Sequence, residues 1–181
     1  LLEQGTRPDL LLGNNVLAHV PNLNDFVAGM KIVLADQGTI TMEFQHLVRL
    51  IEENQFDTIY QEHYCYFSLL AVEHVFARHG LTIYDVQQLP THGGSLRIYA
   101  CHAENESLPV QPAVNDLRQE EIDQGYCQLE KYRGFAARVE ETKQKLLQFL
   151  IEAKRAGKSV VGYGAPGKGN TLLNYCGVRT D

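Results

Sequence analysis

Tyr60, Glu62 and His63 lie within four consecutive positions and combine the side chains that enzymes use for proton transfer. Histidine titrates near neutral pH, so His63 is suited to act as a base. The phenol of Tyr60 supplies a proton donor, and the carboxylate of Glu62 can orient the imidazole ring. A buried aromatic cluster that holds one hydrogen-bonded histidine is the alternative interpretation. The segment is therefore a candidate for acid–base chemistry in surroundings that exclude water.

A second polar segment holds Asn15 and His19, between an apolar run and Pro21. Asparagine at the end of a strand and histidine ahead of a helix are well placed to line the rim of a ligand site. A helix cap beside a surface histidine is the other interpretation. We therefore treat both residues as candidates for a ligand rim.

A third segment runs from His92 through two glycines to Ser95 and Arg97. Glycines let a backbone approach an anion closely, and an arginine can bind phosphate through two parallel hydrogen bonds. An ordinary hairpin turn explains the same residues. The segment is a candidate for phosphate binding.

A fourth segment, residues 162–171, is rich in glycine and precedes a predicted helix. Its first six positions match GxGxxG, which alone is weak support for a dinucleotide site. Its spacing does not match a P-loop. Backbone N–H groups at such a turn can bind a phosphate. The candidate contacts here are Gly164, Lys168, Asn170 and Tyr175.

The order of the predicted elements indicates how these segments are positioned. A short apolar strand is predicted within residues 9–17, a helix after the capping residue Asn22, and an alternating strand over 39–44. A strand–helix–strand order predicts a parallel pair in an α/β sheet. Segments 14–19 and 45–63 would then open onto the same rim, where ligands of such sheets bind.

The rest of the chain continues this pattern. A helix over 68–79 is followed by strands over 81–86 and 95–100, which predict an antiparallel pair at the edge of the sheet. Residues 105–112 are polar and contain two prolines, as in a linker. A long helical region then ends at Gly157, and a buried type of strand is predicted over 159–163.

Composition narrows the function classes. The chain has 181 residues, 44% of them hydrophobic, and a formal net charge of −6 without a basic stripe, which argues against nucleic acid as a partner. No apolar run approaches the roughly 20 residues of a membrane span, and no signal peptide is visible, so a cytoplasmic location is expected. The four cysteines are widely spaced, which predicts free thiols and no metal site in this chain.

Taken together, the four segments resemble the SAM-dependent sugar C-methyltransferase family, of the type that methylates C3 of TDP-4-keto-6-deoxyhexoses. The resemblance covers nearly the whole chain, and the four motifs occur in the family's order and spacing. The matching stretches are Asn15-Val16-Leu17-Ala18-His19-Val20-Pro21, Tyr60-x-Glu62-His63-x-x-Tyr66-Phe67-Ser68, Leu89-Pro90-Thr91-His92-Gly93-Gly94-Ser95-Leu96-Arg97 and Gly162-Tyr163-Gly164-Ala165-Pro166-Gly167-Lys168-Gly169-Asn170-Thr171-Leu172-Leu173-Asn174-Tyr175.

The resemblance implies a protein with an N-terminal zinc-binding lobe, a Rossmann-like SAM domain and a second Rossmann-like lobe for the TDP-sugar. Residues 1–104 would be the C-terminal half of the SAM domain, with later strands and an antiparallel edge pair. Residues 105–157 would be a linker and long helices, and residues 158–181 the start of the second lobe. The zinc cysteines and the glycine-rich SAM loop are not in this sequence, so this chain alone is expected to be inactive.

The resemblance also implies a mechanism. A base removes the C3 proton beside the C4 ketone of the TDP-4-keto-6-deoxysugar, and the enolate carbon attacks the methyl group of S-adenosyl-L-methionine. His63 would be the base, and Tyr60 and His19 would lie near the enolate oxygen. Glu62 would orient His63 or hold a sugar hydroxyl. The substrate contacts would come from Asn15, His92, Ser95, Arg97, Gly164, Lys168, Asn170 and Tyr175.

The residues alone leave two other classes of protein open. The glycine-rich turn at 162–169 also fits a nicotinamide-dependent Rossmann protein. A sugar-nucleotide binding module without catalysis fits the candidate phosphate contacts equally well. Binding experiments distinguish the three classes: SAM binding indicates the methyltransferase, NAD binding the nicotinamide-dependent protein, and TDP binding without SAM the binding module.

Overall fold

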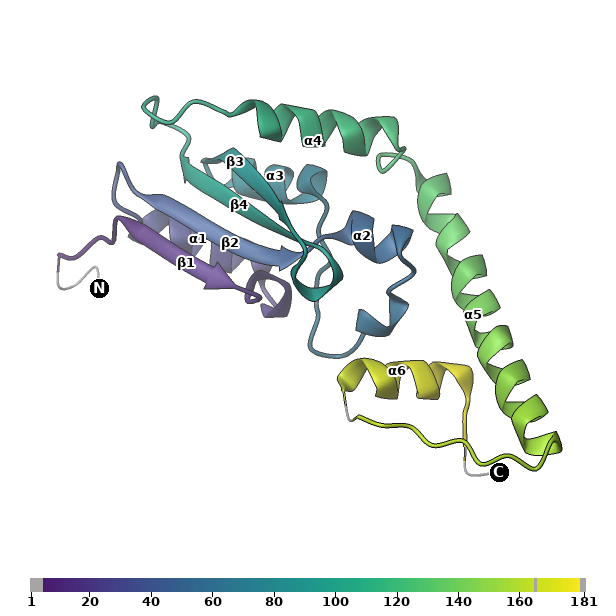
Figure 1. Ribbon diagram of the computed structural model, residues 1–181. Helices are drawn as coiled ribbons and strands as arrows, with labels where there is room; N and C mark the ends of the chain where they lie inside the picture. The colour runs from purple at the N-terminus through teal and green to yellow at the C-terminus, as the bar shows by residue number, and fades with distance from the viewer. Residues whose placement is uncertain (1–4, 165, 180–181) are drawn as a thin grey trace.

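The computed structural model describes residues 5–164 and 166–179, and its centre is a mixed four-stranded sheet. The strand order is β1-β2-β4-β3 (Figure 1). β1 pairs with β2 in parallel, whereas β4 is antiparallel to both β2 and β3. The predicted parallel pair and antiparallel pair are therefore confirmed, with β3 at the edge. The strands are β1 (Leu10–Asn14), β2 (Thr39–Gln45), β3 (Leu81–Leu89) and β4 (Ser95–His102).

Two amphipathic helices cover one face of this sheet (Figure 1). α1 (Leu23–Val33) connects β1 to β2, and the side chain of Asn22 caps it by accepting a hydrogen bond from the Asp25 N–H at 3.1 Å. α3 (Leu69–Arg78) precedes β3. Both helices bury apolar residues against the sheet, including Val27, Met30, Val72 and Phe76. The predicted cap and both predicted helices are confirmed.

A short helical segment between β2 and α3 forms a second, smaller core. It comprises α2 (Leu47–Glu52) and the 3-10 helix η3 (Phe56–Thr58). Val48, Leu50 and Ile51 of α2 pack against Tyr126. Tyr66, in the loop that carries residues 60–63, also packs against this core and connects the loop to it.

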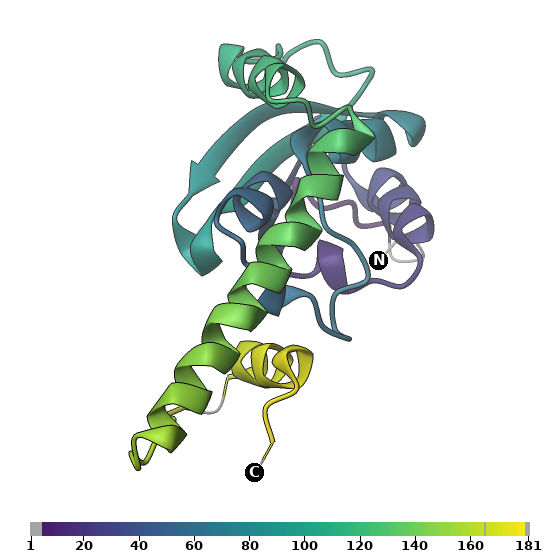
Figure 2. The same cartoon turned by 90° about the vertical axis from the view of Figure 1, so that its right-hand side faces the viewer.

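The C-terminal third of the chain is helical. α4 (Pro112–Asp123) lies beside α3 and β3, and the 27-residue α5 (Leu129–Arg155) runs away from the sheet (Figures 1 and 2). After Gly157 the chain turns back, and α6 (Gly167–Cys176) packs against η3. α6 thereby brings Lys168 of the glycine-rich segment close to Gln45 at the carboxyl end of β2.

Among the described residues, no helix combines the length and the apolar character that crossing a membrane requires.

One buried carboxylate connects three helices. Glu121 of α4 is 1% exposed, and its Oε1 atom lies 2.8 Å from Nε2 of His46, which precedes α2. The same carboxylate accepts hydrogen bonds from the N–H groups of Leu69 and Leu70 at 2.8 and 2.9 Å. These donors belong to the first turn of α3, where a negative charge is favourable. Glu121 thus fixes α4 against the start of α3 and the end of β2.

The strand predicted over residues 159–163 does not form in the described part of the chain. Residues 158–164 have no regular structure, and Val161 and Tyr163 are fully exposed. A strand is stable only when a neighbouring strand pairs with its backbone, and none lies beside this segment among the described residues. Its apolar run correctly indicates strand-forming side chains but cannot supply the pairing partner.

Candidate active site

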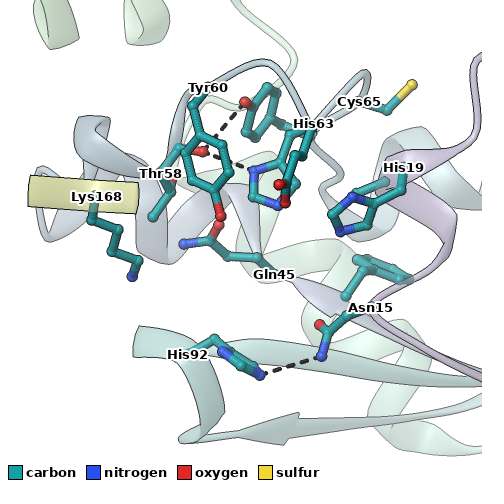
Figure 3. Close-up of a pocket in the computed structure, with 13 residues that line it drawn as sticks. Asn15, His19, Gln45, Thr58, Tyr60, His63, Cys65, His92 and Lys168 are labelled. Carbon is teal, nitrogen blue, oxygen red and sulfur yellow. Dashed lines mark hydrogen bonds between the residues drawn. The ribbon is translucent and has the colours of Figure 1, made fainter. Parts of the chain in front are cut away.

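The four sequence motifs contribute to one cavity of about 250 Å³ at the carboxyl ends of β1 and β2 (Figure 3). Three segments distant in sequence supply its walls: the turn after β1, the loop between η3 and α3, and the start of α6. The β3–β4 turn adds His92. The predicted site residues that line the cavity are Asn15, His19, Tyr60, Glu62, His63, His92 and Lys168.

His63 is held in a defined orientation. Its Nδ1 atom lies 2.8 Å from the carbonyl oxygen of Thr58. A carbonyl only accepts hydrogen bonds, so Nδ1 carries the hydrogen, and in the neutral ring Nε2 keeps its lone pair. The rings of Tyr60 and His19 lie 4.6 and 4.8 Å from the His63 ring, measured between centroids. The hydrogen bond to Thr58 thus leaves Nε2 of His63 as the acceptor of the neutral ring, beside the rings of Tyr60 and His19.

Glu62 does not provide the orientation predicted for it. The N–H of His63 donates to the carbonyl of Tyr60 at 3.0 Å, so residues 60–63 form a tight turn. This turn brings the phenol and imidazole together and leaves the Glu62 side chain exposed. The carbonyl of Thr58 therefore orients His63, while Glu62 lines the cavity mouth.

The two remaining rim residues are hydrogen-bonded to each other. Nδ2 of Asn15 donates to Nε2 of His92 at 3.2 Å, across 77 residues of sequence. Both residues adopt left-handed backbone angles, with φ of 56° and 54°. Asparagine tolerates this region, whereas histidine adopts it at some cost, and such strain is concentrated at functional sites.

Glu43 of β2 underlies this rim and was missed by sequence reasoning. Its carboxylate accepts hydrogen bonds from the hydroxyl of Thr91 at 2.8 Å and from the guanidinium of Arg97 at 2.7 Å. Its backbone carbonyl accepts the N–H of Asn15 at 2.7 Å. The available signal was that Glu43 is the only charged residue in its strand. Arg97 is therefore engaged by Glu43 and does not line the cavity.

Replacing Glu43 with glutamine is expected to lower the free energy of unfolding by about 2 kcal/mol at neutral pH, because charge-assisted hydrogen bonds are lost. Burial acts to raise the pKa of Glu43, but the hydrogen bonds from Thr91 and Arg97 outweigh it and the pKa is lowered from 4.5. The carboxylate's stabilising effect is therefore present above pH 4.5 and is lost as pH falls below it. Urea unfolding at pH 7 and pH 4 checks this, and an equal difference at both values would contradict it.

The glycines of the β3–β4 turn serve packing. A Cβ atom at Gly93 would lie 2.6 Å from Gln55, and one at Gly94 would lie 2.6 Å from Arg49. The hydroxyl of Ser95 donates to the carbonyl of Thr91 at 3.0 Å, and Ser95 is 1% exposed. The structure therefore does not bring Ser95 to the cavity, and the glycines allow the turn to approach α2.

The glycine-rich segment contributes one residue to the cavity, Lys168 of α6. Gly164 and Asn170 are exposed and lie outside its lining. The ring of Tyr175 packs 5.2 Å from that of Phe56, which holds α6 against η3. Ala165, within the same motif, lies outside the described residues. Because no strand precedes the turn among these residues, it lacks the strand–turn–helix geometry of a dinucleotide site.

Gln45, Thr58 and Tyr66 also line the cavity and were not predicted. Gln45 is the last residue of β2, and position at the carboxyl end of a strand was a usable signal for it. Thr58 acts through its backbone carbonyl, which has no signature in a side-chain pattern.

The comparisons with known proteins place this chain, with its pocket at the strand ends of a mixed α/β sheet, in a family. The model of the C-methyltransferase C-terminal domain family matches residues 90–181, so this chain belongs to the C-methyltransferase family. It is 38% identical over 169 residues to the C-methyltransferase NovU of Streptomyces niveus. That match covers 93% of this chain and 40% of the relative. The family inferred from the four motifs is confirmed.

Solved structures with similar folds are more distant. Magnesium protoporphyrin IX methyltransferase from Synechocystis PCC 6803, with bound SAH, matches with 12% identity and a TM-score of 0.43, over 54% of this chain and 46% of that one. The M1.HpyAVI–SAM complex matches with 11% identity and a TM-score of 0.36, over 58% and 48% of the two chains. Each likeness covers little more than half of this chain.

Proposed function

We propose that this chain carries the proton-transfer site of a SAM-dependent C-methyltransferase that acts on a nucleotide-linked keto-deoxysugar. The observation that carries the proposal is the geometry of His63. Its Nδ1–H is bound by the Thr58 carbonyl at 2.8 Å, which leaves Nε2 as an acceptor. Methylation of carbon requires removal of a proton from that carbon, and this arrangement supplies the base.

The substrate's own chemistry explains why one histidine suffices. In a TDP-4-keto-6-deoxyhexose, the C4 ketone makes the C3 proton acidic, because the carbanion is delocalised as an enolate. Nε2 of His63 takes this proton, and the Thr58 carbonyl stabilises the resulting imidazolium through the Nδ1–H bond. The hydroxyl of Tyr60 and the ring of His19 donate to the enolate oxygen, where preorganised donors contribute about 3 kcal/mol each.

The described residues fit only the reacting end of the cofactor. Sites that enclose ligands of this size span about 300–1,000 Å³, and the cavity of about 250 Å³ is too small for SAM and a sugar together. Among the described residues, Glu62 is the only carboxylate in its lining, and Glu62 is exposed. S-adenosyl-L-methionine, when bound, supplies the electrophilic methyl group, and the residues of this chain supply the proton acceptor.

The arrangement of elements supports the assignment of two parts of the chain to different lobes. The sheet ends with β4 at His102, which suits residues 1–104 as part of the SAM domain. α5 then leads to residues 158–181, which we assign to the start of the sugar-nucleotide lobe. Lys168 reaches the cavity from this part and offers a positive charge to the diphosphate of the TDP-sugar. We infer that the reaction takes place in the cytoplasm, as the sequence predicts.

Deuterium exchange in the full-length protein tests the proposal. Incubation with a TDP-4-keto-6-deoxyhexose in heavy water is expected to exchange the C3 proton even without SAM, because deprotonation precedes methyl transfer. Calorimetric titrations with SAM, NAD and TDP provide the second readout. Binding of SAM together with exchange supports the proposal. Binding of NAD without SAM, or of TDP with neither SAM binding nor exchange, would overturn it.

A further inference from the structure

We infer that Gln45 determines substrate specificity by accepting a hydrogen bond from a hydroxyl of the sugar ring. The inference rests on the proposed function and assigns a role to a residue outside the four motifs. Gln45 is the last residue of β2, is half-buried, and lines the same cavity as His63. Figure 3 shows its amide among the side chains of Tyr60, His63 and Lys168.

A chain of hydrogen bonds fixes which way the Gln45 amide points. Nε2 of Gln55 lies 2.7 Å from the carbonyl oxygen of Gly93 and 2.7 Å from Oε2 of Glu53. A carbonyl and a carboxylate only accept hydrogen bonds, so this atom must be the nitrogen of the Gln55 amide and uses both of its hydrogens. Oε1 of Gln55 is therefore an acceptor on the opposite side.

The orientation of Gln45 follows from that of Gln55. Oε1 of Gln55 lies 2.8 Å from the terminal amide of Gln45, and as an acceptor it requires the nitrogen of Gln45 to face it. Oε1 of Gln45 then points elsewhere, and no described residue donates to it. It is not a fully buried unpaired atom either, so it remains accessible to a ligand. The protein thus presents a preoriented acceptor beside its base.

The substrate's geometry indicates which group meets this acceptor. His63 acts at C3, and Tyr60 and His19 hold the oxygen on C4, so the remaining carbon next to the reaction centre is C2. A hydroxyl at C2 is a donor, whereas a methylene at C2 offers none. A site built to bind a hydroxyl disfavours an analogue that lacks it, because its own polar group loses a partner. Gln45 therefore selects sugars that keep the C2 hydroxyl.

The experiment compares two sugars and four forms of the full-length protein. The sugars are a TDP-4-keto-6-deoxyhexose and its 2-deoxy counterpart, and the forms are the wild type, Gln45→Met, Gln55→Met and Gln144→Met. Methionine keeps the length of the side chain and removes its hydrogen bonds. Gln144 is exposed on α5, outside the cavity, and provides the matched control.

In the wild type and in Gln144→Met, kcat/KM is expected to favour the hydroxylated sugar by about tenfold. Gln45→Met removes this preference through a KM about tenfold higher for the hydroxylated sugar, while kcat changes less than about threefold. Gln55→Met, which frees the Gln45 amide to rotate, reduces the preference partly.

Each outcome has a single meaning. If Gln45→Met keeps the wild-type preference, or if it lowers kcat equally for both sugars, Gln45 does not read the hydroxyl. Retention of the full preference in Gln55→Met would overturn the preorientation by Gln55. If the wild type neither exchanges the C3 proton nor methylates either sugar, the proposed function fails instead.

Discussion

Replacing His63 with glutamine is expected to slow deuterium exchange at C3 of the keto sugar by about a thousandfold, because general base catalysis typically contributes 10²- to 10⁴-fold. Glutamine can keep the hydrogen bond to the Thr58 carbonyl, which is 2.8 Å from Nδ1 in the native protein. It has no group that takes a proton near neutral pH. The substitution therefore removes the chemistry and preserves the local contact.

The exchange assay without SAM separates this effect from methyl transfer. His74→Gln is the matched control, since His74 is exposed on α3 and lies outside the cavity. His19→Gln supplies the second comparison, and a decrease of about 10²-fold is expected for the loss of one donor to the enolate oxygen. Exchange at the wild-type rate in His63→Gln would exclude His63 as the base. A complete loss in His19→Gln with normal exchange in His63→Gln would reverse their roles.

The second large effect is structural. Glu121→Leu is expected to lower the free energy of unfolding by about 3 to 5 kcal/mol, because a hydrogen-bond donor left without an acceptor in the protein interior costs about 1–3 kcal/mol. The carboxylate satisfies Nε2 of His46 and the N–H groups of Leu69 and Leu70. Leucine leaves these three donors, of which those of His46 and Leu69 are buried, without this acceptor.

Amide hydrogen exchange locates this loss within the full-length protein. Exchange at Leu69 and Leu70 is expected to accelerate in Glu121→Leu, together with a lower midpoint of urea unfolding. Glu120→Leu, on the exposed face of the same helix, provides the control and is expected to change stability by less than about 0.5 kcal/mol. Unchanged protection of the two amides in Glu121→Leu would show that α3 is held by other contacts.

The sheet was predictable because its signals are local. Alternation over 39–44, the cap at Asn22 and the turn between the last two strands each lie within a few residues, and each formed as expected. The prediction of a strand over 159–163 was wrong for the opposite reason. Its strand-forming composition was correct, but strand formation depends on a neighbour that is not part of the local pattern.

The motifs that form the site were predictable from the sequence, whereas the hydrogen bonds between its residues were less so. The strand order places Asn15, His19 and the 60–63 turn at one rim, and the cavity brings them together. Side-chain proximity in sequence suggested Glu62 as the partner of His63, whereas the turn gives that role to the Thr58 carbonyl. Glu43 and Gln55 act from beneath the rim through partners far along the chain, and no spacing rule reveals such pairs.

The bond between Asn15 and His92 joins residues 77 positions apart, and Lys168 reaches the same cavity from α6. Contacts of such long sequence separation form late in folding, because the intervening chain must first be ordered. Helices and the hairpin between β3 and β4 can therefore appear while the rim is still open. A refolding chain would regain its circular dichroism signal before the cavity around His63 is assembled, so formation of this cavity reports completion of the tertiary structure and not the onset of compaction.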